Sequence, residues 1–129
     1  MKICIYGAGA IGGYLGAKLT EIGADVTLIA RGPHYNAIKQ DGLRLRKDGK
    51  ELIVYPKCVD TAEKAGKQDF IFVTLKAHSV PGCLDAFKVL KKDDTSFVWG
   101  VNGIPWWYFY NHPDSNFKNK KVTSVDPDN

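Results

Sequence analysis

The sequence predicts an α/β fold in which a parallel sheet carries helices on both faces. Two observations support this fold class. Short apolar runs at residues 3–6, 25–30, 70–75 and 96–99 alternate with segments whose apolar side chains recur at helical spacing. A glycine-rich turn also follows the first apolar run directly and opens the first helical segment. Strands that alternate with helices pair in parallel, because each helix returns the chain to the same end of the sheet.

The first thirty residues form a strand, a helix and a second strand. Residues 3–6 are apolar and are followed by a glycine, as in a short buried strand. The next segment has one apolar helical face, made of Ile11, Leu15, Leu19 and Ile22. Gly23 stands where a helix C-cap is expected, and residues 25–30 are rich in β-branched side chains. Together these segments predict a βαβ unit.

The middle of the chain adds a helix and a hairpin. Residues 34–39 predict a short helix. Residues 43–46 and 52–55 flank Asp48-Gly49, a turn signal, so a small hairpin is expected.

The later segments continue the alternation. Thr61 with Glu63 resembles the N-terminal cap of a short helix. Residues 70–75 and 96–99 predict the third and fourth core strands. Between them, residues 79–90 predict a helix with a single apolar face, made of Val80, Cys83, Leu84, Phe87 and Leu90.

The turn after the first strand has the pattern G-x-G-x-x-G. Its place between a strand and a helix, inside a βαβ unit, is typical of dinucleotide-binding, Rossmann-type sheets. Gly7 permits the tight turn, Gly9 lets a pyrophosphate approach the backbone, and Gly12 lets the helix lie close to the sheet. The predicted cofactor-binding residues of this glycine loop (residues 7–12) are Gly7, Ala8, Gly9, Ala10, Ile11 and Gly12. The alternative is a glycine-rich turn that binds no ligand.

The end of the second strand indicates which dinucleotide binds. NAD-binding versions of this fold place an Asp or Glu there, which binds the ribose 2′-hydroxyl. Residues 28–32 contain no carboxylate, and Arg31 occupies the position. Because a guanidinium can hold a 2′-phosphate through charge-assisted hydrogen bonds, the sequence favours NADP. The alternative is a solvated arginine at a strand end.

Polar residues follow the third and fourth core strands, at the edge where ligands of open α/β sheets bind. Lys76 could reach a phosphate or lie near the nicotinamide ribose, with an ordinary surface lysine as the alternative. His78 fits better as a helix-start or solvated histidine. Asn102 can both donate and accept hydrogen bonds toward a ribose or a substrate carbonyl. We therefore take Asn102 as the candidate catalytic residue and a cofactor contact, with an ordinary Asn-Gly turn as the alternative.

Four segments, in this order and spacing, resemble the ketopantoate reductase (2-dehydropantoate 2-reductase) family: GAGAIGGYLGAKL, the strand end at Arg31, DFIFVTLKA and VNGIPWWYF. The resemblance implies NADPH-dependent reduction of 2-dehydropantoate to pantoate, on the route to pantothenate and coenzyme A. It also implies that the glycine loop holds the pyrophosphate and Arg31 the 2′-phosphate. Lys76 would contact the cofactor, and Asn102 would lie near the nicotinamide and the substrate.

The resemblance further implies a second, helical domain that supplies a lysine as general acid. Residues 125–128 resemble the family just before its next strand. We therefore expect residues 1–129 to form an incomplete NADP-binding Rossmann domain, truncated before its last strands and lacking the catalytic domain. Such a fragment is expected to bind NADPH but to be inactive. The alternatives are a non-catalytic NAD(P)-sensing domain and an NADP-dependent reductase of another 2-keto acid.

Composition argues against several other classes. The net charge of +4 suits an anionic ligand, but no basic stretch is interleaved with aromatic residues as nucleic-acid binding would require. No apolar run is long enough to cross a bilayer. Three widely spaced cysteines argue against disulfides and against a metal site, so a cytoplasmic protein is expected. Six aromatic residues fall between positions 99 and 110: Trp99, Trp106, Trp107, Tyr108, Phe109 and Tyr110. Trp106, Trp107 and Tyr110 form either core or a surface that packs on the missing domain, and an exposed aromatic segment would let the fragment self-associate.

Overall fold

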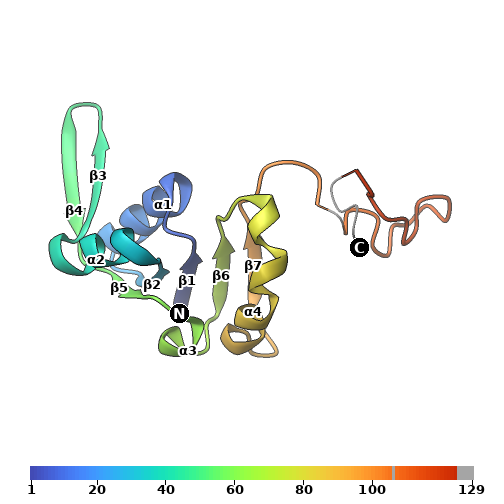
Figure 1. Ribbon diagram of the computed structural model, residues 1–129, viewed down its shortest axis with the longest axis horizontal. Helices are drawn as coiled ribbons and strands as arrows, with labels where there is room; N and C mark the ends of the chain where they lie inside the picture. The colour runs from blue at the N-terminus through green and yellow to red at the C-terminus, as the bar shows by residue number, and fades with distance from the viewer. Residues whose placement is uncertain (106, 125–129) are drawn as a thin grey trace.

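The computed structural model describes residues 1–105 and 107–124, and its centre is a five-stranded parallel sheet (Figure 1). In order across the sheet, the strands are β5 (Lys57–Val59), β2 (Asp25–Ile29), β1 (Lys2–Tyr6), β6 (Phe70–Val73) and β7 (Ser96–Trp99). The chain leaves β1 toward β2 and later returns to pair β6 with the other side of β1. This reversal is the topological switch point at which open α/β sheets bind ligands. The predicted Rossmann-type α/β fold is confirmed.

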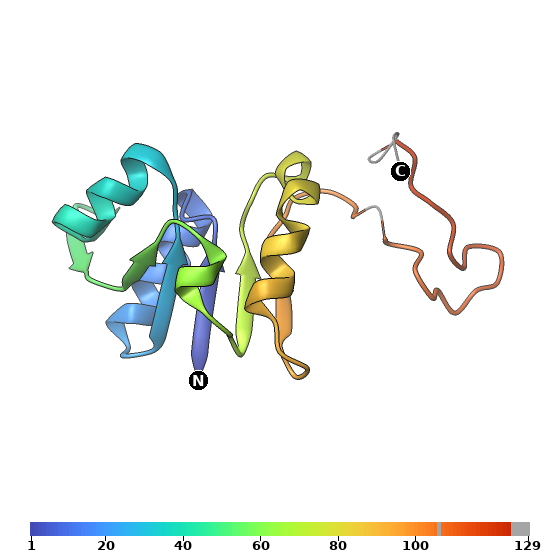
Figure 2. The ribbon, with the colours of Figure 1, turned by 60° about the horizontal axis from the view of Figure 1, so that its bottom comes forward.

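Helices cover both faces of the sheet and enclose two cores (Figure 2). The helices are α1 (Ala10–Glu21), α2 (Gly32–Asp41), α3 (Ala62–Ala65) and α4 (Leu84–Leu90). Alternate side chains of β1 face opposite ways, since Ile3 and Ile5 join the core of α1 and α2, whereas Cys4 joins the core of α3 and α4. Because both faces are buried, β1 is apolar throughout its centre rather than alternating.

The expected hairpin is confirmed as β3 (Leu43–Lys47) paired with β4 (Lys50–Val54). Asp48 and Gly49 form its turn, and both have positive φ. The hairpin projects from the body of the molecule in Figure 1. Its base is anchored because the buried side chains of Leu43 and Val54 join the core of α1.

Two sequence expectations about strands and helices are corrected. The sequence interpretation missed β5, so residues 70–73 and 96–99 are the fourth and fifth strands of the sheet. With three residues, β5 is too short to show a hydrophobic period. The helix expected from residue 79 begins as two 3₁₀ turns, Ala77–Ser79 and Pro81–Cys83, and becomes α-helical only at Leu84. A proline and a glycine at residues 81–82 account for the late start.

The two predicted helical faces are also only partly correct. In α1, Ile11 is 60% exposed and Ile22 is 77% exposed. The buried residues of this helix are small, namely Gly12, Gly16 and Ala17. In the later helix, Leu84 is 46% exposed while Phe87 and Leu90 are buried. Leu15 and Leu19 pack against the core, as the sequence predicted. At Gly12 and Gly16 a Cβ atom would collide with Ile5 and Leu28, so size rather than hydropathy selects the residues at these two positions.

After β7 the described residues, 100–105 and 107–124, form turns and contain no further helix or strand. Figures 1 and 2 show this segment leading away from the sheet. Tyr110 is 78% exposed, so it is not a core residue of the described structure. The expectations for Trp106 and for residues 125–128 lie outside the described residues. Within the described part of the chain, none of the helices has the length and apolar character needed to span a membrane.

Candidate functional site

The glycine loop begins where β1 ends, and Gly7 makes its turn. The φ angle of Gly7 is +106°, in the region that favours glycine. A Cβ atom here would lie 2.8 Å from Cδ2 of Leu75 and 3.3 Å from the backbone of Thr74. The Gly7 N–H donates to the Ile29 carbonyl at 3.2 Å. Both conformation and packing therefore require glycine at this position.

Gly12 is required for a different reason, which is the close approach of α1 to the loop. A Cβ atom at this position would overlap the carbonyl oxygen of Gly7 and would also collide with the Thr74 hydroxyl. That hydroxyl donates to the Gly7 carbonyl oxygen at 2.7 Å. The end of β6 thus pins the loop from one side while α1 packs on it from the other. Thr74 was not singled out in the sequence, because a threonine at a strand end carries no motif of its own.

Gly9 differs from both, because none of the described residues requires a glycine there. Its φ angle of −71° is open to any residue. A Cβ atom at Gly9 would meet no heavy atom of the described residues within 4 Å. The space beside this backbone is therefore open to a ligand that a side chain would keep away. A pyrophosphate that must touch the backbone fits this arrangement.

The first turn of α1 gives that space its electrostatic character. Gly9 is the N-cap of the helix and offers no side chain to its free N–H groups, and the first turn contains no acidic residue. The first N–H groups of a helix lack partners within the helix, and the helix dipole places positive partial charge beside them. Ala10 and Ile11 are exposed here. An anion of phosphate type can therefore bind at this end of α1.

His34 makes a contact to the loop that the sequence interpretation did not predict. Its Nε2 atom lies 2.6 Å from the carbonyl oxygen of Ala8, across 26 positions of sequence. His34 belongs to the first turn of α2, while Ala8 is a buried residue of the loop. The sequence predicted His34 only as the start of a short helix, because no spacing rule links it to the loop.

Arg31 follows β2 directly and is the N-cap of α2. The side chain is exposed. Its charge acts on Tyr6, the last residue of β1. The pKa of that phenol is raised to about 12, mainly by burial and then by Cys83, while the Arg31 charge opposes the rise. The guanidinium therefore influences the carboxyl end of β1, the end at which the glycine loop begins.

Lys76 and Asn102 follow the next two strands across the sheet, β6 and β7. Both side chains are exposed. Lys76 precedes a 3₁₀ turn and its carbonyl accepts the Ser79 N–H at 2.9 Å. The ends of β6 and β7 pack closely, because a Cβ atom at Gly100 would lie 3.1 Å from Cγ2 of Thr74. All four strands are parallel, so the glycine loop, Arg31, Lys76 and Asn102 lie along one edge of the sheet.

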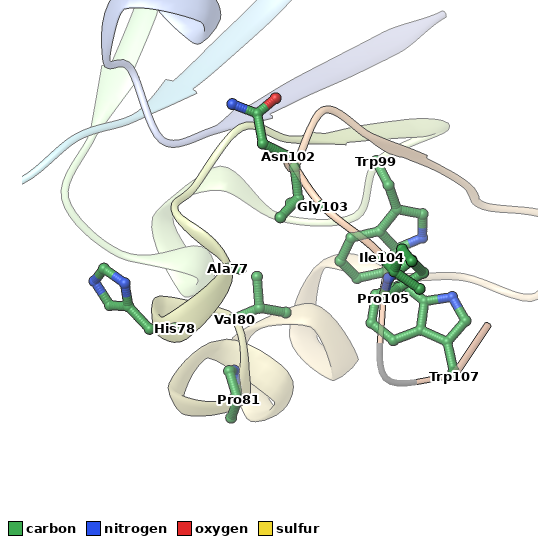
Figure 3. A pocket seen from close by; sticks show the side chains of 11 residues that line it. Ala77, His78, Val80, Pro81, Trp99, Asn102, Gly103, Ile104, Pro105 and Trp107 are labelled. Atoms are coloured by element: carbon green, nitrogen blue, oxygen red, sulfur yellow. The ribbon is translucent and has the colours of Figure 1, made fainter. Parts of the chain in front are cut away.

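A pocket of about 600 Å³ opens between the segments that follow β6 and β7 (Figure 3). Its lining residues are Ala77, His78, Val80, Pro81, Trp99, Val101, Asn102, Gly103, Ile104, Pro105 and Trp107. One wall is aromatic, because the rings of Trp99 and Trp107 lie 4.6 Å apart between centroids. In Figure 3 the Asn102 amide points away from these two indoles. The volume and the mostly apolar lining with few polar groups are those of a small-molecule site.

His78, which was predicted to be a helix-start or solvated histidine, is exposed and lines this pocket. In the part of the chain that the structure describes, no group of three or more His, Cys, Asp or Glu side chains comes together in a way that could hold an ion. The three cysteines are separate, buried thiols, and burial raises the pKa of Cys4 to about 12.

Comparison with known proteins finds one family over most of the chain. The family model described as ketopantoate reductase PanE/ApbA matches residues 3–105. A 2-dehydropantoate 2-reductase of Mesorhizobium japonicum is 45% identical over 128 residues, which is 98% of this chain and 39% of the relative. That of Pyrococcus horikoshii is 39% identical over 93 residues, 72% of this chain and 30% of the relative. The chain thus spans about two-fifths or less of the length of these curated relatives.

Solved structures also match most of this chain and a smaller share of their own length. A candidate ketopantoate reductase from Ralstonia solanacearum matches with a TM-score of 0.88 and 35% identity, over 98% of this chain and 39% of that one. A ternary structure of D-mandelate dehydrogenase with NADH and anilino(oxo)acetate matches with a TM-score of 0.73 and 33% identity. That match covers 81% of this chain and 34% of the other.

Proposed function

This chain belongs to the ketopantoate reductase family, and from that premise we propose that it forms the NADPH-binding part of an enzyme that reduces 2-dehydropantoate to pantoate. The observation that carries the proposal is the contrast within the glycine loop. Gly7 and Gly12 are required by the fold, whereas Gly9 leaves open a space that only a ligand would need. A glycine-rich turn with no ligand offers no reason for Gly9.

Each predicted site residue then has a role toward the dinucleotide. The backbone of the glycine loop and the first turn of α1 bind the pyrophosphate. Arg31 binds the 2′-phosphate through charge-assisted hydrogen bonds, which makes NADP the preferred cofactor. Lys76 contributes a further positive charge beyond β6. Asn102 lies between the cofactor and the pocket, where its amide can bind the ribose or the substrate carbonyl.

The chemistry follows from this arrangement. When bound, NADPH supplies the hydride that reduces the keto carbon to an alcohol. Asn102 orients the substrate carbonyl by donating a hydrogen bond to its oxygen, and the apolar pocket wall keeps water from the reacting atoms. The proton for the resulting alkoxide comes from an ammonium group on a helical domain, as the family resemblance implies. Residues 1–129 by themselves are therefore proposed to bind NADPH with little or no turnover.

A second candidate function is the reduction of an aromatic 2-keto acid. The aromatic wall made by Trp99 and Trp107 suits a planar apolar group, and one similar structure is a D-mandelate dehydrogenase. The site would bind the cofactor in the same way and differ only in the pocket. Comparing 2-dehydropantoate with phenylglyoxylate, on a chain completed with a helical domain, distinguishes the two by their kcat/KM values.

Isothermal titration calorimetry with the 129-residue chain tests the proposal most directly. We expect NADPH to bind with measurable heat and more tightly than NADH. Circular dichroism first establishes that the sample is folded. If folded protein takes up neither dinucleotide, the proposed function is wrong. Equal affinity for both dinucleotides would contradict the role of Arg31 and leave an NAD(P)-sensing domain as the better description.

A further inference from the structure

We infer that His34 is a positioning residue for the phosphate-binding backbone, because it fixes the peptide between Ala8 and Gly9. This inference rests on the proposed function, since it assigns His34 a part in the same site. It goes beyond the glycine pattern, which explains why the loop is glycine-rich but not what holds its central peptide in place.

The hydrogen bond itself defines the chemistry. The Ala8 carbonyl oxygen can only accept, so the Nε2 atom of His34, 2.6 Å away, carries the hydrogen. A neutral ring that makes this contact is therefore the Nε2–H tautomer. The two residues belong to different elements, the loop after β1 and the first turn of α2. The contact is partly buried, because Ala8 is buried while His34 is exposed.

Peptide geometry turns this bond into a constraint on Gly9. A peptide unit is planar and trans, so the Ala8 carbonyl and the Gly9 N–H point in opposite directions. With the carbonyl held toward α2, the Gly9 N–H is directed away from that helix. The side of Gly9 that a Cβ would occupy is open. His34 therefore keeps a carbonyl oxygen, which would repel a phosphate, turned toward the protein.

The other contacts of the loop do not duplicate this one. The Thr74 hydroxyl donates to the Gly7 carbonyl, one peptide earlier in the chain, and the Ile29 carbonyl accepts the Gly7 N–H, two peptides earlier. They fix the entry to the loop, whereas His34 fixes its middle. His34 also joins the loop to α2, whose N-cap is Arg31. The two proposed phosphate contacts, the loop backbone and the guanidinium, are thereby connected through one short helix.

The test compares His34→Ala with His34→Gln, whose side-chain amide can still donate to the Ala8 carbonyl. NADPH and adenosine 2′-monophosphate are titrated into each protein, because the second ligand has the 2′-phosphate but no pyrophosphate. We expect His34→Ala to weaken NADPH binding by about tenfold and His34→Gln by less than about threefold. Adenosine 2′-monophosphate should change by less than about twofold in both. His112→Ala is the matched control, since His112 lies in the segment after β7.

Each alternative result has a distinct meaning. Unchanged NADPH affinity in His34→Ala, or equal loss in the Ala and Gln variants, would overturn the inference. So would a loss of the same factor for both ligands, because that pattern reports a general structural defect. Nitrogen chemical shifts of the His34 ring give a readout that needs no cofactor, and an Nδ1–H tautomer would also overturn it. If folded wild-type chain binds no NADPH but shows the Nε2–H tautomer, the proposed function fails while the contact stands.

Discussion

The two ends of this chain build the site in different ways. Between β1 and α2, the glycine loop is held by backbone packing, by Thr74 and by His34. After β7, aromatic side chains pack mainly on one another: Phe109 stacks on Phe117 with ring centroids 5.5 Å apart, and Tyr108 is 56% exposed. The cofactor side of the proposed site, which is the glycine loop with Arg31, is thus formed in advance by the sheet. The substrate side, which is the pocket beside Trp99 and Trp107, depends on the segment after β7, and the sheet alone does not fix that segment.

The largest expected effect of breaking the cofactor side comes from Gly12→Ala. The new Cβ would overlap the Gly7 carbonyl oxygen, which is backbone and cannot turn aside. Either α1 or the loop must move, so we expect the free energy of unfolding to fall by about 3 kcal/mol or more. Urea denaturation followed by circular dichroism measures the change. A variant as stable as the wild type would mean that α1 does not pack as closely as described.

Gly9→Ser tests whether the glycine loop binds a ligand, because this change should weaken cofactor binding without lowering the stability of the fold. A serine N-cap is at least as favourable as glycine, so the stability should change by less than about 0.5 kcal/mol. The side chain nevertheless fills the space proposed for the pyrophosphate, and we expect NADPH affinity to fall by about 30-fold or more, roughly 2 kcal/mol. Calorimetry on the two proteins side by side measures this. Retained affinity would contradict the proposed position of the pyrophosphate.

The glycine loop and its surroundings show which features could be predicted from the sequence and which could not. The strand–loop–helix pattern predicted the sheet, the loop and the position of Arg31, because these depend on local spacing. The inner face of α1 was predicted incorrectly at Ile11, since the close approach that selects Gly12 and Gly16 arises only in three dimensions. The His34 contact could not be predicted for the same reason, as it joins residues 26 positions apart.

The pocket, too, could be predicted from the sequence only in part. Asn102 was found as a polar residue after a strand, but the pairing of Trp99 with Trp107 depends on how the chain turns back after residue 100. No periodic signal governs that turn. The three-residue strand β5 escaped prediction because it is defined by its pairing with β2.

A smaller effect is expected at the edge of the cofactor side, from Arg31→Asp. Loss of a charge-assisted contact to the 2′-phosphate, with a carboxylate in its place, should weaken NADPH binding by about 1.5 kcal/mol, or roughly tenfold. NADH lacks that phosphate, so its affinity should change by less than about threefold. The ratio of the two dissociation constants is the measurement. If both affinities fell together, Arg31 would be acting on the fold rather than on the 2′-phosphate.

The smallest effect is expected after β7, where Phe117→Ala tests whether that segment belongs to the same folding unit as the sheet. Phe117 is 43% exposed. Among the described residues its ring contacts lie within its own segment, where it stacks on Phe109 and meets His112 edge-on. We expect its removal to lower the stability of the sheet by less than about 1 kcal/mol and to leave NADPH affinity unchanged. Phe87→Ala is the matched comparison, because Phe87 is 5% exposed and packs against Tyr6 and Phe97. That variant should lose about 3–5 kcal/mol. Equal losses in the two variants would show that the aromatic segment folds cooperatively with the sheet, and the difference between the two regions would disappear.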